Sequence, residues 1–495
     1  MNTKTSTSNN PLTGLLLGAG ASYEIGIPLV WDLTSELRKF LTPEKLTSLN
    51  NSWRLHGTGY PDEVINELIT ALNQLDLHYE NILGRLETKF RTGSQFRQEF
   101  HGLYSWLVQL VGTLIYDHHM SKVDYIKSNL RFYNGISFLA SRNNPLWVFS
   151  LNHDVIIECI AMELKIPINS GFPNDVVTLP RRKKSGEIIG QLKASVISGD
   201  VLQNSNMPFF NSGTNGINLL KIHGSLDIFT FREGQDLLKI LPLEQSVDGV
   251  IASLRTANEE LIHPDMNSAN GKVNAVNEIA YSDDANVMQF LRRSLLAGAY
   301  KFTSKFSQVL PVRILDNFKF YINNLSSLIC IGYSFGDNHI NQVILDWLDN
   351  DGQRRLEIVR PTIAVIPTVL QTHADQVTIS SSKATEYFDS IAGIVRGKRE
   401  LLEKRLAALR LKFPDKTVVT DALQKFITEN QKEKAELLGK WVSTLPVLNG
   451  DIDLVTLGMT QSELNRKGLE IANSSYEDVL ESFLNSVESL PTRKK

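Results

Sequence analysis

The sequence has little cysteine, no excess of one charge and no long apolar run. Its 495 residues include two cysteines, Cys159 and Cys330, which cannot supply a disulfide framework or a four-cysteine zinc site. Lys and Arg number 51 against 54 Asp and Glu, a net charge of −3, so no global positive field attracts nucleic acid or an anionic membrane. The apolar runs fall far short of the roughly 18 to 20 residues that span a bilayer. These absences favour a reducing compartment and exclude a transmembrane protein.

Composition and the amino-terminal residues set further limits. With 42% hydrophobic and 21% charged residues, the chain has the make-up of a globular protein, which excludes wholesale disorder and collagen-like structure. At about 150 residues per domain, its length suggests roughly three domain-sized pieces. Residues 1–13 are polar and lack the apolar segment of a secretory signal, so we expect a disordered start and a cytoplasmic protein.

Five short apolar runs predict buried strands separated by segments of helical period. The runs are residues 15–17, 145–151, 219–222, 328–331 and 362–366. Between the first two, apolar residues recur at three and four residue steps, which predicts a helical insertion at about 32–135. Residues at about 165–216 show no such period and are expected to form an irregular insertion of loops or a hairpin. The pattern predicts an α/β fold with a Rossmann-like parallel sheet covered on both faces.

The last quarter of the chain has a different character. Beyond about residue 370 the sequence predicts no further strand, and charge-rich, helix-favouring segments follow. They span residues 386–411, 421–441 and 461–489 and are broken at Pro414, Pro446 and Gly450. We therefore expect a domain boundary near residue 368, with a catalytic domain over 14–368 and a mainly helical carboxyl-terminal domain over 369–495.

The turn after the first expected strand suits phosphate binding. Gly18-Ala19-Gly20-Ala21-Ser22 follows residues 15–17 directly, and a helix is expected after it. Glycines let the backbone approach a phosphate closely, and a helix start offers unpaired amide hydrogens. Tyr23 stands where the dehydrogenase fingerprint Gly-x-Gly-x-x-Gly needs its third glycine, which disfavours hydride transfer. A plain tight turn explains the same glycines.

Polar motifs follow three later strands in the same way. In chain order the motifs are Gly18-Ala19-Gly20-Ala21-Ser22 with Gly26-Ile27-Pro28, then Ser150-Leu151-Asn152-His153-Asp154, Lys221-Ile222-His223-Gly224 and Ile331-Gly332-Tyr333-Ser334. Open α/β sheets bind ligands at the carboxyl ends of their strands. Over about residues 14–368 this ordered set resembles the sirtuin family, with its Gly-Ala-Gly-x-Ser loop, its Gly-Ile-Pro, its Thr-x-Asn-x-Asp element, its catalytic His-Gly and its later Gly-x-Ser.

The resemblance implies an NAD site and a role for each motif. The first loop would cradle the pyrophosphate, the second motif would lie near the nicotinamide ribose, the histidine would be the catalytic base, and the last motif would contact the adenosine side. The residues so implied are Gly18, Ala19, Gly20, Ser22, Gly332 and Ser334 for binding, and His223, Asn152 and Asp154 for catalysis. Cleavage of the nicotinamide bond passes through an oxocarbenium-like state, so an amide that orients water and a histidine that takes a proton suit it.

Departures from the family point to one branch of it. Deacetylase sirtuins carry a zinc ribbon with paired cysteines, which two cysteines cannot make, so no metal is expected. The family's Gly-Ile-Pro-Asp-Phe-Arg reads Gly-Ile-Pro-Leu-Val-Trp at residues 26–31, and its Thr-Gln-Asn reads Ser150-Leu151-Asn152. In that family the ribbon helps to form the acyl-lysine groove, so the function that the resemblance still implies without a ribbon is NAD cleavage itself. The chain is in this respect similar to the sirtuin-like NAD hydrolases of bacterial anti-phage defence.

The resemblance therefore implies an NAD⁺ hydrolase that yields nicotinamide and ADP-ribose and depletes NAD⁺ in abortive infection. It further implies NAD⁺ as substrate, a homo-oligomer, and a phage-derived trigger or a partner defence protein such as an ATPase, without membrane association. Direct binding of nucleic acid stays open. The alternatives are an NAD-dependent protein deacylase that uses the same His223, and a non-catalytic sensor of NAD or ADP-ribose. Hydrolysis and cyclisation of the product are not separated by the sequence.

Each candidate also has a purely structural interpretation. His223 can be a turn residue, and Asn152 and Asp154 can form an Asx turn and a helix cap for residues 155–161. Asp337 and His339 can cap the next helix or contact a ligand. The remaining candidates are His118-His119, interpreted as a solvated helix face, and the basic run over residues 181–184, interpreted as a solvated loop or a phosphate contact.

Overall fold

The computed structural model divides the chain into two compact units, Met1–Ile394 and Val395–Lys495. It describes residues 12–182, 188–204, 207–231, 236–257, 278–282, 288–293, 312–362, 365–413, 416–473 and 475–488. Side chains are described for the same residues except 180–182, 188–190, 231, 278–282, 288–293, 416 and 488. Among these residues, no helix is both long and apolar enough to cross a membrane.

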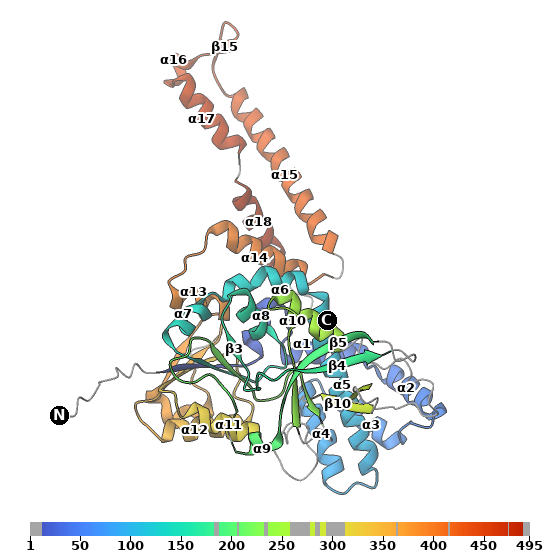
Figure 1. Ribbon diagram of the computed structural model, residues 1–495. Coiled ribbons are helices and arrows are strands. Elements are labelled where there is room, and N and C mark those ends of the chain that lie inside the picture. Colours follow the sequence, from blue (N-terminus) through green and yellow to red (C-terminus); the bar gives the residue numbers. More distant parts are fainter. Residues whose placement is uncertain are drawn as a thin grey trace, which may run out of the picture. The chain divides into compact units, whose positions relative to one another are not determined.

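The first unit is built on a seven-stranded parallel sheet (Figure 1). In order across the sheet, its strands are β13 (Val377–Ser380), β12 (Arg355–Val359), β11 (Ser327–Ile331), β1 (Thr13–Leu17), β2 (Leu146–Ser150), β6 (Ile217–Lys221) and β3 (Ile168–Asn169). All six neighbouring pairs are parallel. The predicted α/β fold with a Rossmann-like parallel sheet is confirmed.

Four of the five expected strands are confirmed, and the position of the fifth is wrong. The strand expected over 362–366 is β12, which ends at Val359, and Thr362, Val365 and Ile366 lie outside any strand. Pro361 explains the difference in part, because proline cannot donate to a strand ladder. Glu357 also interrupts the apolar run of β12, so the sequence does not show the pattern of a buried strand there. In the structure the Glu357 carboxylate accepts a hydrogen bond from the Tyr387 hydroxyl at 2.7 Å.

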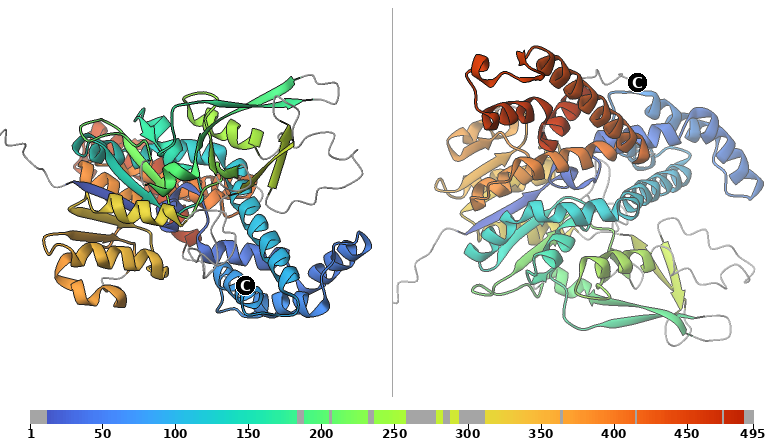
Figure 2. Two further views of the ribbon diagram at one scale, coloured as in Figure 1. Left: turned by 60° about the horizontal axis from the view of Figure 1, so that its bottom comes forward. Right: turned by 90° about the horizontal axis from the view of Figure 1, so that it is seen from above.

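Helices cover both faces of the sheet (Figure 2). Leu15 and Leu17 of β1 belong to one core, and Leu16 belongs to the other, as expected for side chains that alternate along a strand. The first core is covered by α1 (Val30–Phe40), α2 (Pro43–Leu55), α3 (Asp62–Asn73), α4 (Tyr79–Arg91), α5 (Arg97–Ser121), α6 (Val123–Asn129), α7 (Gly135–Arg142), α8 (Ile156–Glu163), α10 (Val247–Arg255) and α13 (Ala384–Ala392). The second is covered by α9 (Gly199–Gln203), α11 (Arg313–Ile322) and α12 (Asn338–Asp349). The predicted helical insertion is confirmed, since α1 to α7 all lie between β1 and β2.

A second sheet occupies part of the region expected to be irregular. It has six antiparallel strands in the order β4 (Val177–Arg182), β5 (Ile188–Ile197), β8 (Asp236–Ile240), β7 (Ile228–Phe231), β10 (Met288–Arg293) and β9 (Glu278–Ser282). Of the two structures expected at 165–216, loops or a hairpin, the hairpin is present as the pair β4 and β5. Its place in a six-stranded sheet was not expected. Leu192 and Ala194 are buried in the small core of this sheet while Lys193 between them is exposed, which is the period of a strand.

The first unit also ends later than the expected boundary at 368. The expectation of no strand beyond about residue 370 is wrong, because the 3₁₀ helix η5 (Thr368–Gln376) leads into β13, which pairs with β12. After it, α13 packs against α7. The unit therefore extends to Ile394. At the other end, the expected disorder over 1–13 lies outside the described residues except for Leu12 and Thr13. Thr13 begins β1, and the Leu12 carbonyl accepts a hydrogen bond from the Ser326 amide at 3.0 Å.

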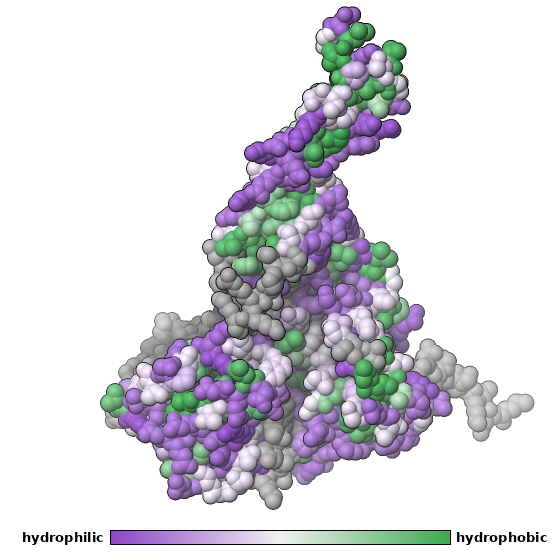
Figure 3. All heavy atoms as spheres, turned by 180° about the vertical axis from the view of Figure 1, so that it is seen from behind, coloured by the Kyte–Doolittle hydropathy of each residue, from purple (hydrophilic) through white to green (hydrophobic). Residues whose placement is uncertain are grey.

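The second unit is mainly helical, as predicted. It comprises α14 (Lys398–Arg410), α15 (Lys416–Ser443), the hairpin β14 (Val447–Leu448) and β15 (Asp451–Ile452), α16 (Leu454–Leu457), α17 (Gln461–Ala472) and α18 (Tyr476–Glu488). Its own core includes Leu402, Leu406 and Leu480. Hydrophobic side chains also appear on its surface among hydrophilic ones (Figure 3).

Candidate functional site

The strand order brings the four motifs to one edge of the parallel sheet. The neighbours β11, β1, β2 and β6 end immediately before Gly332, Gly18, Leu151 and Ile222. The chain leaves β1 through helices on one face and leaves β11 through α12 on the opposite face. Such a reversal between adjacent strands is the switch point at which open α/β sheets bind ligands. The predicted motifs therefore lie where this fold places a ligand.

The glycines of the first loop are explained by contact with the loop after β11. The Gly18 amide donates to the Ile331 carbonyl at 2.9 Å, and the Gly20 amide donates to the Gly332 carbonyl at 3.0 Å. A Cβ added to Gly18 would lie 2.6 Å from the Gly332 carbonyl oxygen, and one on Gly20 would lie 2.7 Å from the Gly332 Cα. Close approach of two backbones requires glycine here. Both amides are thus engaged within the protein, as in the plain-turn interpretation.

The helix expected directly after this loop is wrong. Two short 3₁₀ turns follow instead, η1 (Ala19–Ala21) and η2 (Tyr23–Ile25), and the first α-helix begins only at Val30. Gly26 at φ +98° ends the second turn. Three groups from α6 and the neighbouring residues secure the segment: the Tyr133 hydroxyl donates to the Ala21 carbonyl at 2.7 Å, the Tyr125 hydroxyl to the Glu24 carbonyl at 3.1 Å, and the Lys122 ammonium to the Gly26 carbonyl at 2.7 Å. The helical insertion therefore fixes the loop.

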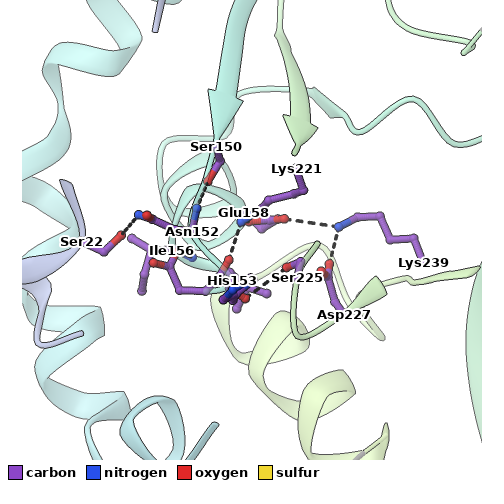
Figure 4. A network of polar contacts seen from close by, with 12 residues as sticks. Ser22, Ser150, Asn152, His153, Ile156, Glu158, Lys221, Ser225, Asp227 and Lys239 are labelled. Carbon is purple, nitrogen blue, oxygen red and sulfur yellow. Dashed lines mark hydrogen bonds and ion pairs between the residues drawn. The ribbon is translucent and has the colours of Figure 1, made fainter. Parts of the chain in front are cut away.

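Asn152 joins the end of β2 to the glycine loop. Its side-chain nitrogen donates to the Gly18 carbonyl at 2.9 Å. The same nitrogen donates to the Ser22 hydroxyl at 3.2 Å, and the backbone amide donates to the Ser150 hydroxyl at 3.2 Å (Figure 4). Ser22 itself is buried. These bonds use the amide nitrogen of Asn152, and no donor among the described residues bonds its side-chain oxygen. That oxygen can accept a hydrogen bond from a ligand or a water.

Asp154 has a structural role in the described contacts, as the first residue of an Asx turn before α8. Its carboxylate accepts a hydrogen bond from the Ile156 amide at 3.1 Å at the start of α8, and its carbonyl accepts one from the Lys221 ammonium. The side chain is buried. The contacts agree with the Asx-turn interpretation, whereas the N-cap of α8 is Val155, whose side chain makes no capping hydrogen bond.

His223 is buried and pairs with Asp337. Its Nε2 lies 3.3 Å from the Asp337 Oδ2. The other carboxylate oxygen of Asp337 caps α12, accepting hydrogen bonds from the amides of His339 at 2.9 Å and Ile340 at 3.3 Å. The cap interpretation of Asp337 is confirmed, and its contact with a ligand stays a prediction. No pattern in the sequence predicts that this carboxylate lies beside His223.

The loop over residues 332–337 passes the ends of β1 and β2, and this brings Asp337 close to His223. His223 follows β6 and Asp337 follows β11, and β1 and β2 lie between them. At about 4.8 Å per strand this is a distance of about 14 Å. The Asn341 side chain donates to the Phe335 carbonyl at 2.8 Å, and the Tyr333 hydroxyl donates to the Asp337 carbonyl at 3.1 Å. Phe335 adopts φ +61°, a strained conformation for a large side chain that these bonds hold in place.

The interpretation of His118-His119 as a solvated helix face is wrong. His119 is fully buried, with its Nδ1 2.8 Å from the Ile115 carbonyl oxygen and its Nε2 accepting a hydrogen bond from the Val155 amide at 3.3 Å. Burial lowers the pKa of His119, outweighing the opposite effect of Asp154. His118 lies 2.8 Å from the Glu36 carboxylate. The basic run at 181–184 lies outside the residues whose side chains are described.

Ser334 is exposed at the same edge, and Gly332 adopts φ +67° beside the glycine loop. Within the described ranges, no three His, Cys, Asp or Glu side chains converge as metal ligands would. A scan against protein-family models gives no match for this chain, and a search of the curated proteins gives no match either.

Proposed function

We propose that this protein hydrolyses NAD⁺ to nicotinamide and ADP-ribose. The observation that carries the proposal is the meeting of four motifs, in the order of the sirtuin resemblance, at the carboxyl ends of the adjacent strands β11, β1, β2 and β6. An extended dinucleotide laid along this edge would have its adenosine end near Ser334 and its nicotinamide ribose near Asn152 and His223.

The pyrophosphate would lie against the loop over residues 18–22. Because the amides of Gly18 and Gly20 bond to the loop after β11, their glycines contribute close approach rather than donors. In this proposal the Ala19 amide and the Ser334 hydroxyl supply hydrogen bonds to the ligand. In this proposal Asp154 does not touch the ligand, since its carboxylate accepts a hydrogen bond from the Ile156 amide and its carbonyl accepts one from the Lys221 ammonium.

The chemistry follows from the remaining groups. The bond between nicotinamide and the ribose breaks with its electron pair leaving on nicotinamide, and positive charge develops on the ribose. A water held by the Asn152 side-chain oxygen attacks the anomeric carbon, and its proton passes to His223. Asp337, 3.3 Å away, stabilises the imidazolium that forms. The products are nicotinamide and ADP-ribose.

The test is release of nicotinamide and ADP-ribose from NAD⁺ by the purified full chain, with and without a lysate of phage-infected cells. His223→Ala and Asn152→Ala are each expected to lower turnover by at least about 100-fold while remaining folded. His373→Ala is the matched control, because His373 pairs with Asp349 at 2.8 Å outside the site. Cleavage at the wild-type rate in both site variants would sink the assignment.

The alternatives have their own signatures in the same assay. Formation of O-acyl-ADP-ribose from an acylated peptide would identify a protein deacylase. Saturable NAD⁺ binding with no nicotinamide release under any activating condition would select a sensor of NAD or ADP-ribose. Cyclic ADP-ribose as the product would replace hydrolysis by cyclisation.

A further inference from the structure

Behind His223 lies a buried chain of four charged side chains with alternating sign. Lys221, Glu158, Lys239 and Asp227 have side chains only 1%, 6%, 9% and 9% exposed. The Glu158 carboxylate lies 3.5 Å from the Lys221 ammonium and 3.3 Å from the Lys239 ammonium, and Lys239 also bonds to Asp227 (Figure 4). We call these four residues the buried charge chain.

Two members of the buried charge chain, Asp227 and Lys239, favour the charged form of each other. Burial opposes ionisation of Asp227, but Lys239 and Lys221 outweigh it and lower the pKa of this carboxyl group. Burial likewise opposes the charge on Lys239, and Asp227 and Glu158 outweigh it and raise the pKa of this ammonium. Taking paired ions out of water costs about as much as their attraction returns, so a buried ion set adds little net stability. Its contribution is the geometry that it imposes.

Two members of the buried charge chain lie on either side of His223 in the sequence. Lys221 precedes His223 by two residues, and Asp227 follows it by four, just before β7. Between them, the Leu226 amide and the Ser225 hydroxyl donate to the His153 carbonyl at 2.9 and 3.3 Å. Since Lys221 also donates to the Asp154 carbonyl, the His223 turn is tied to the turn that carries Asn152.

The chain also reaches into the second sheet. Lys239 belongs to β8, which pairs with β5 and β7, whereas Lys221 ends β6 of the parallel sheet and Glu158 belongs to α8. The Ile240 amide, next to Lys239, donates to the Asp227 carbonyl at 2.8 Å. Residues of the antiparallel sheet therefore contact Asp227, at the end of the His223 turn.

We propose that Lys221, Glu158, Lys239 and Asp227 are positioning residues that hold His223 in the geometry required for NAD⁺ cleavage, with Lys239 as the contribution of the second sheet. This rests on the proposed function. In the proposed mechanism none of the four touches the substrate; they act through the turn over residues 222–228.

Two variants of the full chain test this, with a control from the same sheet. Lys239→Met removes one charge at similar volume, and the pair Lys239→Met with Asp227→Asn removes one charge of each sign and leaves Lys221 facing Glu158. The control is Lys193→Met, because Lys193 is exposed on β5. The measurements are thermal unfolding, hydrogen–deuterium exchange of the peptide spanning 222–228, and kcat and KM for NAD⁺ in the presence of infected-cell lysate.

The paired variant is expected to unfold near the wild-type temperature, since it buries no unpaired charge. Its peptide over 222–228 should exchange at least tenfold faster than wild type, and its kcat should fall about 100-fold with KM changed less than threefold. Lys193→Met should match wild type in all three. Wild-type exchange and kcat in the paired variant would overturn the proposal. An inactive wild-type protein would refute the NAD⁺ hydrolase instead, and the exchange measurement would still decide whether the chain positions the turn.

Discussion

One carboxylate oxygen of Asp337 caps α12 and the other lies 3.3 Å from His223. Different substitutions of Asp337 can therefore separate the helix cap from the charge beside His223. Asparagine also caps helices well, so Asp337→Asn should keep the cap of α12 and remove only the charge beside His223. We expect Asp337→Asn to unfold within about 0.5 kcal/mol of wild type and to lower NAD⁺ turnover at least tenfold.

Asp337→Ala is the comparison, since it should lose the charge and also about 1 kcal/mol of capping. Thermal unfolding and nicotinamide release measure the two effects separately. Unchanged turnover in Asp337→Asn would show that the carboxylate serves the helix alone.

Gly332 lies at a position where any side chain would cause backbone strain and steric overlap. Its φ of +67° disfavours any side chain, and a Cβ there would overlap the Ala21 amide nitrogen and the Gly20 backbone. We expect Gly332→Ala to lower the free energy of unfolding by about 3 kcal/mol, from backbone strain and overlap together.

Gly336→Ala is the matched control in the same loop. Gly336 is exposed, and its nearest neighbour would be the Ser334 hydroxyl at 3.6 Å. A change within about 0.5 kcal/mol is expected. Chemical denaturation of both variants measures the difference, and equal stabilities would contradict the close packing of the two loops.

At the scale of elements, α5 and α8 meet through His119, and this contact predicts a pH dependence. The folded protein holds His119 neutral, because burial lowers its pKa below the ordinary value of about 6.5. Below that pH the unfolded chain binds a proton that the folded chain does not, so stability falls as pH falls. The slope reaches at most about 1.4 kcal/mol per pH unit.

His119→Gln should reduce this dependence, since glutamine stays neutral. Thermal unfolding at pH 7.5 and pH 5.5 is expected to show a smaller loss for His119→Gln than for wild type. His56→Gln, at the exposed end of α2, should behave as wild type. If His119→Gln and wild type lose equal stability between pH 7.5 and pH 5.5, His119 does not cause the pH dependence.

The elements differ in how far their sequence reveals them. The parallel strands are continuous apolar runs because both faces are covered, so four of them can be read from the sequence. In β8 all five residues of Asp-Leu-Leu-Lys-Ile are buried, although two carry charge. Asp227 and Glu158, distant in the sequence, make the burial of Lys239 tolerable. No local sequence pattern predicts a buried strand of this kind.

At the scale of the whole molecule, the second unit carries a prediction about assembly. Val447 and Leu448 of the hairpin are 64% and 61% exposed, and Val455 beside it is 91% exposed. Exposed apolar groups that gather at one place mark interaction surfaces. From the family resemblance we expect self-association through this unit, weak activity of the isolated protein and stimulation by assembly or by a phage component.

Val447→Asp with Leu448→Asp should therefore lower the oligomeric state in light scattering and lower the stimulated NAD⁺ turnover. Val395→Asp is the control, because Val395 is 95% exposed away from the hairpin in sequence. An oligomer unaffected by the hairpin substitutions would place assembly elsewhere, and a fully active monomer would contradict the expectation of control by assembly.

Local sequence patterns are enough to predict the class of fold and the four motifs of the candidate site. Buried strands and helical insertions have local periods, and the polar motifs follow strand ends directly, so both can be read from neighbouring residues. Only the folded chain shows which strands are neighbours, and that the loop after β11 passes the ends of β1 and β2 and brings Asp337 to 3.3 Å from His223. It also shows that Lys221 and Lys239 are buried rather than solvated. The physical reason is that strand order and the burial of charge depend on partners far apart along the chain, which no local period records.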